Sequence, residues 1–234
     1  MKYAIIAAGE GSRLAEEGIN VPKPLVKLGG IPMIERLIRI FQKNGAEEIV
    51  IIVNTLNPQT EVYVKKLMER EDGKNIRLVV KTTPSSMHSF FELSQHLGDA
   101  PFCLTTVDTI FREAEFAKYI HQFCTGEADG MMAVTDFIDD EKPLYVGTND
   151  QLDITGFYDT DANCRYISGG IYCLKPIALK TLQRCMEEGR SRMRNFQRAL
   201  VEDGLHLKAY PFQKILDVDH AGDIAKAEAF LANS

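Results

Sequence analysis

The sequence predicts an α/β protein with a doubly wound, Rossmann-like mixed sheet and a small antiparallel insertion. Up to about residue 135, short apolar runs alternate with amphipathic stretches of helical length, as in parallel strands joined by helices. After about Asp136, strand-like segments follow one another without long helices between them. We therefore expect a single domain over residues 1–234. Its core is residues 1–135 and 207–234, and a lobe of about 136–206 lies over the open edge of the sheet.

Hydrophobic periodicity places the elements of the first part. Apolar runs of strand length occur at residues 2–7, 48–53, 76–80, 102–106 and 131–135. Amphipathic helices are predicted at residues 32–44, 60–69, 86–97 and 113–124. In the first of these helices Met33, Leu37 and Phe41 fall on one face, and Gly45 suits the end of the helix.

The later part begins with a polar stretch, residues 136–143, which is predicted to be a loop. Strands are predicted at residues 145–148, 153–158, 166–174, 207–211 and 215–218. Helices are predicted at residues 178–188, 192–202 and 221–232.

Composition excludes several classes of protein. The 234 residues are 45% hydrophobic and 26% charged, which suits a globular protein with a sizeable core. The net charge of -6 argues against nonspecific nucleic-acid binding, and no apolar run reaches the roughly 18–20 residues that span a membrane. No signal peptide is visible, and the five cysteines are scattered without a C-x-x-C pair. A cytoplasmic protein with reduced thiols is expected.

The loop after the first predicted strand carries the most specific signal. Gly9 and Gly11 lack a Cβ, so backbone N–H groups there can approach phosphate oxygens closely. Arg13 adds a forked donor that can bind two phosphate oxygens together. Ligands of open α/β sheets bind beyond the carboxyl ends of the strands, where this loop lies. The pattern therefore favours a phosphate-binding loop over a plain turn.

Two common phosphate-binding motifs do not match this loop. A dinucleotide-binding motif needs a third glycine where Leu14 stands, and a Walker A loop needs a terminal Gly-Lys-Ser/Thr, which is absent. Further along, Lys23 lies between Pro22 and Pro24, which restrict the local backbone. A lysine on so stiff a segment loses less entropy on binding a phosphate than a freely moving one.

These segments together resemble a known family. The run from Ala7 to Leu14, the Pro22-Lys23-Pro24-Leu25 segment and the run from Gly30 to Ile34 look like the signature of nucleotidyltransferases that activate sugar 1-phosphates and similar phosphate monoesters. The resemblance implies that Arg13 and Lys23 act in catalysis. The nucleotide-binding residues that it implies are Ala7, Ala8, Gly9, Glu10, Gly11, Ser12, Arg13, Lys23, Ser85 and Ser86.

Of these, Ser85 and Ser86 lie between a predicted strand and a predicted helix. One of them could simply cap that helix. The resemblance implies instead that their loop contacts the base and ribose of the nucleotide, and His88 could take part.

Carboxylates at two later positions are candidates for binding Mg²⁺. Asp108 follows a predicted apolar strand, where it could also cap a turn. The resemblance implies that it binds the catalytic metal, together with an acid from the closing segment, Asp217 or Asp219. We expect only one of these two to face the site with Asp108, and we favour Asp219.

The sequence contains fewer specific motifs for the part of the site that would bind the acceptor substrate. Gly169 and Gly170 resemble the acceptor-binding strand of the family, although a β-bulge would also explain two glycines in a strand. Sugar-specific members often carry Glu-Lys-Pro shortly before this strand. Here Glu141-Lys142-Pro143 has these letters but lies earlier, before two further strands.

The resemblance implies transfer of a nucleotidyl group, with Mg²⁺ as cofactor, from a nucleoside triphosphate to a phosphorylated acceptor, most simply a sugar 1-phosphate. Two alternatives stay open: a cytidylyltransferase for phosphocholine or a phosphonate, and a nucleotide-binding regulatory domain without catalysis. A dehydrogenase is disfavoured by Leu14. The sequence leaves open which nucleoside triphosphate and which acceptor are used, and whether the chain forms a homo-oligomer.

Overall fold

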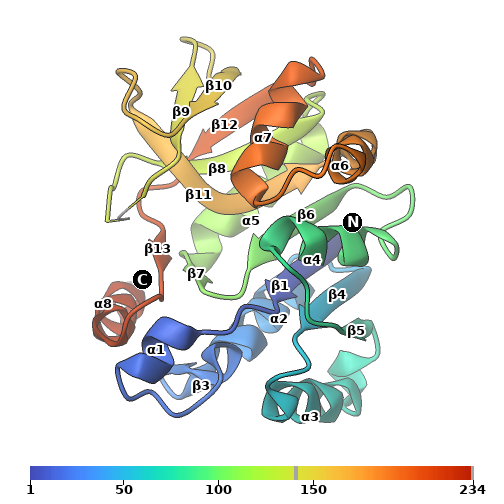
Figure 1. Ribbon diagram of the computed structural model, residues 1–234, viewed down its shortest axis with the longest axis vertical. Helices are drawn as coiled ribbons and strands as arrows, with labels where there is room; N and C mark the ends of the chain where they lie inside the picture. The colour runs from blue at the N-terminus through green and yellow to red at the C-terminus, as the bar shows by residue number, and fades with distance from the viewer. Residues whose placement is uncertain (140–141, 233–234) are drawn as a thin grey trace.

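The computed structural model describes residues 1–139 and 142–232. Within these residues, a nine-stranded sheet runs in the order β10-β9-β11-β6-β1-β4-β5, with β8 and β12 attached beside β11 (Figure 1). Its strands are β1 (Lys2–Ala7), β4 (Glu48–Val53), β5 (Ile76–Val80), β6 (Phe102–Thr106), β8 (Gly130–Thr135), β9 (Tyr145–Thr148), β10 (Ile154–Tyr158), β11 (Tyr166–Leu174) and β12 (Leu207–Pro211).

One end of the sheet, from β6 to β5, is parallel, and the other end is mostly antiparallel. Strand β1 pairs in parallel with β4 and β6, and β4 pairs in parallel with β5. Strand β11 runs antiparallel to β6, β8 and β9. The antiparallel strands thus continue the same sheet, because the nine-residue β11 pairs with the parallel part at its end and with β9 at its start.

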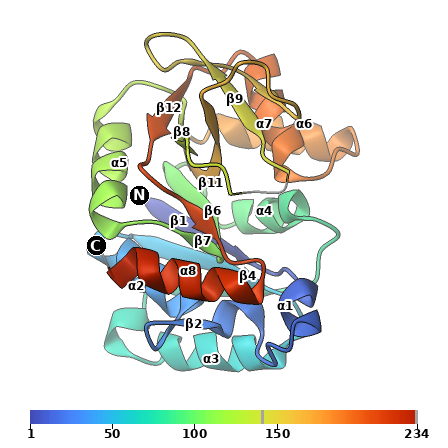
Figure 2. The ribbon, with the colours of Figure 1, turned by 90° about the vertical axis from the view of Figure 1, so that its left-hand side faces the viewer.

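Helices cover both faces of the sheet. Figure 2 shows α2 and α5 on one side of β1 and β6, and α4, α6 and α7 on the other. The helices are α1 (Ser12–Glu16), α2 (Met33–Lys43), α3 (Pro58–Met68), α4 (Ser86–Ser94), α5 (Glu113–Thr125), α6 (Ala178–Glu187), α7 (Met193–Glu202) and α8 (Ala221–Ala232). Lys23–Leu25 and Glu71–Gly73 form single turns of 3₁₀ helix.

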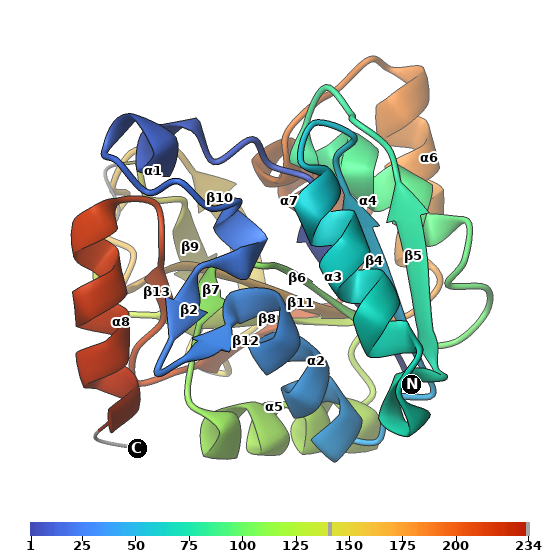
Figure 3. The ribbon, with the colours of Figure 1, turned by 90° about the horizontal axis from the view of Figure 1, so that it is seen from below.

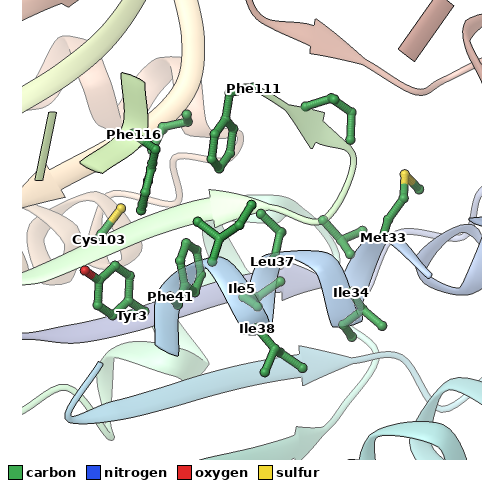
Figure 4. Close-up of a cluster of buried hydrophobic side chains, with 14 of the residues drawn as sticks. Tyr3, Ile5, Met33, Ile34, Leu37, Ile38, Phe41, Cys103, Phe111 and Phe116 are labelled. Atoms are coloured by element: carbon green, nitrogen blue, oxygen red, sulfur yellow. The ribbon is translucent and has the colours of Figure 1, made fainter. Parts of the chain in front are cut away.

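The core explains why β1 is an unbroken apolar run. Tyr3 and Ile5 pack on the side of α2 and α5, whereas Ala4 and Ile6 pack on the side of α4, so both faces of the strand are buried. Figure 4 shows Tyr3 against Phe41, and their rings are stacked with centroids 4.5 Å apart. Such an aromatic pair contributes about 0.5–1.5 kcal/mol beyond its buried area.

Most predicted elements are confirmed to within about two residues, but several short ones were missed. The five-residue α1 and the two-residue strands β2 (Lys27–Leu28), β3 (Ile31–Pro32), β7 (Thr109–Ile110) and β13 (Leu216–Asp217) were not separately predicted, or were predicted longer. So short an element has no periodicity of its own and forms where its tertiary partner lies. The predicted loop 136–143 is described except for Asp140 and Glu141, which lie outside the described residues.

Parallel strands bring their following loops to one edge. β1, β4, β5 and β6 end at Ala7, Val53, Val80 and Thr106. The loop with Gly9 and Gly11 (the glycine loop), Asn54, the loop with Ser85 and Ser86 (the serine loop) and Asp108 follow these four strands in the same order. Ligand sites of open α/β sheets lie at this edge.

Candidate active site

A cavity of about 410 Å³ lies at this edge, between the glycine loop and Asp108. It is lined by all the residues that the sequence analysis assigned to nucleotide binding: Ala7, Ala8, Gly9, Glu10, Gly11, Ser12, Arg13, Lys23, Ser85 and Ser86. Asp108 and Asp219 line it as well. We refer to it as the first cavity.

The two glycines of the loop have different reasons to be glycine. Gly11 has a φ of 68°, and a Cβ on it would lie 3.0 Å from the Cβ of Lys23. Both the left-handed backbone and the close approach of Lys23 therefore require glycine at this position. A Cβ on Gly9 would meet no atom within 4 Å. Open space beside Gly9, in the wall of a cavity, leaves room for a ligand to approach the backbone.

Asn54 holds the glycine loop in place, a role that the sequence analysis missed. This buried side chain donates from Nδ2 to the carbonyl oxygens of Ala8 and Gly9, at 3.2 and 3.0 Å. Its Oδ1 accepts from the backbone N–H groups of Leu56 and Asn57. Its place directly after a buried parallel strand, at the same edge as Gly9, was the available signal.

Two carboxylates and two cations lie together in the lining of the first cavity. The Nζ of Lys23 donates to Asp219 Oδ1 at 2.7 Å and also pairs with Asp108 Oδ2. Arg13 donates to the other oxygen of Asp219 at 3.2 Å. Burial would lower the pKa of Lys23, but Asp108 and Asp219 outweigh that effect and the pKa is raised. Lys23 is therefore a cation in this site.

The two carboxylates fit a divalent cation. Asp108 Oδ1 is buried and has no hydrogen-bond partner among the described residues, so one carboxylate oxygen is left to bind a ligand. No group of three or more His, Cys, Asp or Glu side chains forms a complete metal site in the described part of the chain. Mg²⁺ is commonly held by one or two carboxylates together with substrate phosphates, which suits this pair.

A short ladder brings the distant acids together. β7 and β13 pair antiparallel, with Asp217 opposite Thr109, and Val218 N donates to Asp108 O at 3.1 Å. Alternation of side chains along a strand does not explain why only one of Asp217 and Asp219 lines the first cavity, because residues two apart in a strand share a face. The strand β13 ends at Asp217, so Asp219 is not bound by its alternation. Asp217 lines only a neighbouring cavity, whereas Asp219 also lines the first.

The serine loop uses its hydroxyl groups differently from a helix cap. Ser85 stands at the N-cap of α4 without a side-chain capping bond. Its Oγ lies 2.9 Å from His88 Nδ1 and 3.4 Å from the backbone N of Arg192. The loop is thereby fixed to the start of α7 as well as to its own helix.

A second cavity of about 500 Å³ adjoins the first, and both are lined by Arg13 and Asp219. Basic side chains from distant parts of the chain line it: Arg13, Lys142, Arg194 and Lys226. Arg194 pairs with Asp159 at 2.6 Å, and Lys226 pairs with Asp139 and Asp223 at 3.1 and 3.2 Å. Lys142 of the early Glu-Lys-Pro segment thus lines this cavity, a position that its sequence spacing did not predict.

Gly169 and Gly170 have structural reasons to be glycine. Gly170 has a φ of 72°, at the place where the register of β11 against β8 shifts, as in a β-bulge. A Cβ on Gly169 would collide with the side chain of Ile215. Gly169 lines the second cavity, and Gly170 is not among the lining residues of either cavity.

The fold and this edge of the sheet define the class of the protein, an α/β protein with a glycine-rich loop beside paired carboxylates. Residues 3–201 match the MobA-like NTP transferase domain, and the chain belongs to this family.

In the described part of the chain, no helix has the length and apolar character needed to cross a membrane.

Curated relatives include mannose-1-phosphate guanyltransferases. That of Schizosaccharomyces pombe is 29% identical over 193 residues, which cover 78% of this chain and 52% of the relative. That of Saccharomyces cerevisiae is 35% identical over 126 residues, which cover 50% of this chain and 35% of the relative. The chain therefore spans about half of these relatives' length or less.

Solved structures with the same fold include a glucose-1-phosphate thymidylyltransferase from Bacillus anthracis. It has a TM-score of 0.87 and 17% identity, with 100% of this chain and 96% of that chain covered. An inositol-1-phosphate CTP transferase from T. maritima has a TM-score of 0.76 and 19% identity, with 98% and 97% covered. These likenesses confirm the predicted fold class.

Proposed function

We propose that this protein transfers a nucleoside monophosphate from a nucleoside triphosphate to a sugar 1-phosphate and releases pyrophosphate. The carrying observation is that the ammonium group of Lys23 pairs with both Asp108 and Asp219 in the first cavity, and that Asp219 also lines the second. Two polyanions that react with each other need cations at the point where they meet. One relative is named a mannose-1-phosphate guanyltransferase and one structural neighbour an inositol-1-phosphate CTP transferase. These names support a 1-phosphate as the acceptor.

In this proposal the triphosphate occupies the first cavity. Backbone N–H groups of residues 9–12 and the guanidinium of Arg13 hold the β- and γ-phosphates. Ser85 and Ser86 also line this cavity, and they would contact the ribose and base. Lys23 stabilises the negative charge that develops around the α-phosphate.

The acceptor occupies the second cavity. An oxygen of its phosphate forms a bond to the α-phosphorus, the bond from the α-phosphorus to the bridging oxygen breaks, and pyrophosphate leaves with that oxygen. The acceptor phosphate is already ionised at neutral pH, so no general base is needed. Asp108 and Asp219 would hold Mg²⁺, whose charge offsets the repulsion between the substrates when it is bound.

The lining of the second cavity favours a phosphorylated polyol over phosphocholine. Quaternary ammonium groups are usually recognised by several aromatic faces. Phe137 is the only Phe, Tyr or Trp among the described lining residues, and Lys214 Nζ lies 4.0 Å from the centre of its ring. The basic side chains Lys142, Arg194 and Lys226 suit an anion instead.

A pyrophosphate-release assay tests the proposal. Four nucleoside triphosphates are combined with sugar 1-phosphates, inositol 1-phosphate, phosphocholine and a phosphonate in the presence of Mg²⁺. Release with a sugar 1-phosphate supports the proposal, and release only with phosphocholine or the phosphonate supports the cytidylyltransferase. Nucleotide binding without release across the whole set supports a regulatory domain.

A further inference from the structure

Glu17 connects the phosphate-binding side of the first cavity to the segment that carries Asp219. It directly follows α1, the helix that contains Arg13. Its Oε1 lies 2.6 Å from Nδ1 of His220, 203 positions away, and its Oε2 accepts from Ala221 N at 2.6 Å. A carboxylate only accepts, so Nδ1 of His220 carries the hydrogen in this contact. Figure 3 shows α1 next to the loop that leads from β13 into α8.

The same segment is also held from the side of α8. Asp223 Oδ2 accepts from the backbone N–H groups of Asp219 and His220, at 3.2 and 2.9 Å. That contact is local, because Asp223 lies in the first turn of the helix that follows. It shapes the segment but does not relate it to the glycine loop. Glu17 provides that relation through both of its oxygens.

Arg13 makes a second side-chain contact between α1 and this segment, and in the proposed reaction the triphosphate competes for it. Arg13 and Glu17 are four positions apart, and Arg13 donates to Asp219 Oδ2 at 3.2 Å. An arginine that binds the triphosphate has to turn its donors toward the phosphates. The contact through Glu17 involves no group assigned to substrate, so it can persist while Arg13 changes partner.

We propose that Glu17 is a positioning residue, which fixes α1 relative to Asp219 when Arg13 leaves that carboxylate for the triphosphate. The proposal rests on the proposed function of the site. Without the contact, the phosphate-binding groups and the carboxylate that would hold Mg²⁺ are no longer kept at one spacing. Displacements of about 1 Å in a reacting complex can cost on the order of 100-fold in rate.

The test compares Glu17→Ala and Glu17→Gln with Glu16→Ala. Glu16 is the adjacent, exposed glutamate of the same helix and serves as the matched control. Glu17→Ala should lower kcat by about 10- to 100-fold and raise the Mg²⁺ concentration for half-maximal rate. Glu17→Gln keeps an acceptor for Ala221 N and should recover most of the rate. Glu16→Ala should behave as the wild type.

A second readout does not depend on activity. In the ligand-free protein, hydrogen exchange of the peptide around Ala221 should rise about tenfold in Glu17→Ala, as expected for one lost hydrogen bond, and stay unchanged in Glu16→Ala. Wild-type kcat and Mg²⁺ dependence in Glu17→Ala would overturn the proposal, and so would unchanged exchange. If the wild type itself releases no pyrophosphate, the proposed function fails, while the exchange result still decides whether Glu17 holds the segment.

Discussion

Lys23 and Asp219 are 196 positions apart in the chain and are joined by a hydrogen bond of 2.7 Å between Nζ and Oδ1. The same ammonium pairs with Asp108, so a single lysine bridges two acids from distant segments of the chain. A divalent cation would compete with Lys23 for these oxygens. The arrangement therefore suits a site in which Lys23 turns to substrate phosphates once a metal is bound.

The choice between the two candidate acids can be tested through metal dependence. Asp219→Asn should raise the Mg²⁺ concentration for half-maximal pyrophosphate release by at least the 10- to 100-fold seen when even a supporting group around a metal is lost. Asp217→Asn, two residues earlier and outside the first cavity, should leave it nearly unchanged. The reverse order would assign the metal to Asp217.

Acceptor binding should depend on Arg194 in the second cavity. Arg194→Ala should raise KM for the sugar 1-phosphate by about tenfold or more, because a charged hydrogen bond contributes about 1.5–3 kcal/mol, and leave KM for the triphosphate unchanged. Arg198→Ala is the matched control: Arg198 also lies in α7 and pairs with Asp159, but is not among the residues that line the cavity. Equal effects of the two variants would remove Arg194 from the acceptor site.

Asn54 should contribute to stability and to nucleotide binding together. Asn54→Ala removes both hydrogen bonds that this buried side chain donates to the glycine loop, which should cost about 1–3 kcal/mol in the free energy of unfolding. KM for the triphosphate should rise, because the loop is less well fixed. Asn57→Ala is the control, since Asn57 makes no side-chain capping bond to α3. Denaturant unfolding and steady-state kinetics measure the two effects, and an unchanged KM would show that the loop needs no such support.

Much of the fold could be predicted, because β1, β4, β5 and β6 are apolar runs whose lengths match buried strands. The glycine loop could be located because it follows β1, and Lys23 could be singled out because Pro22 and Pro24 flank it. The choice of Asp219 required the β7–β13 ladder, which is two residues long. Arg194 and Lys226 could not be assigned, since nothing near them in sequence shows that they line one cavity.

A buried acid away from the site predicts a pH dependence of stability. Burial would raise the pKa of Glu35, but hydrogen bonds from Tyr63, Arg39 and Arg70 outweigh it and hold the pKa below its usual value of 4.5. Burial and this carboxylate raise the pKa of Tyr63 to about 12. A lowered pKa means that the stabilisation is complete above the unfolded value and is lost as pH falls through the folded value.

Glu35→Gln should therefore cost about 1–3 kcal/mol at pH 7, and the difference from wild type should shrink as pH falls below about 4.5. Denaturant unfolding across this pH range measures the difference, with Glu71→Gln at an exposed position as the control. A difference that grows toward low pH would contradict the assigned sign.

The rate of Lys23→Ala is the measurement that tests the central claim most directly. Loss of a group that stabilises developing charge typically costs about 100- to 1,000-fold, so pyrophosphate release should fall by at least that factor. Thermal unfolding should show a folded protein that Mg²⁺ stabilises more than it stabilises the wild type, because the cation no longer competes with the ammonium for Asp108 and Asp219. Lys27→Ala, at an exposed lysine four residues on, should keep the wild-type rate. A Lys23→Ala protein that releases pyrophosphate at the wild-type rate would contradict the account.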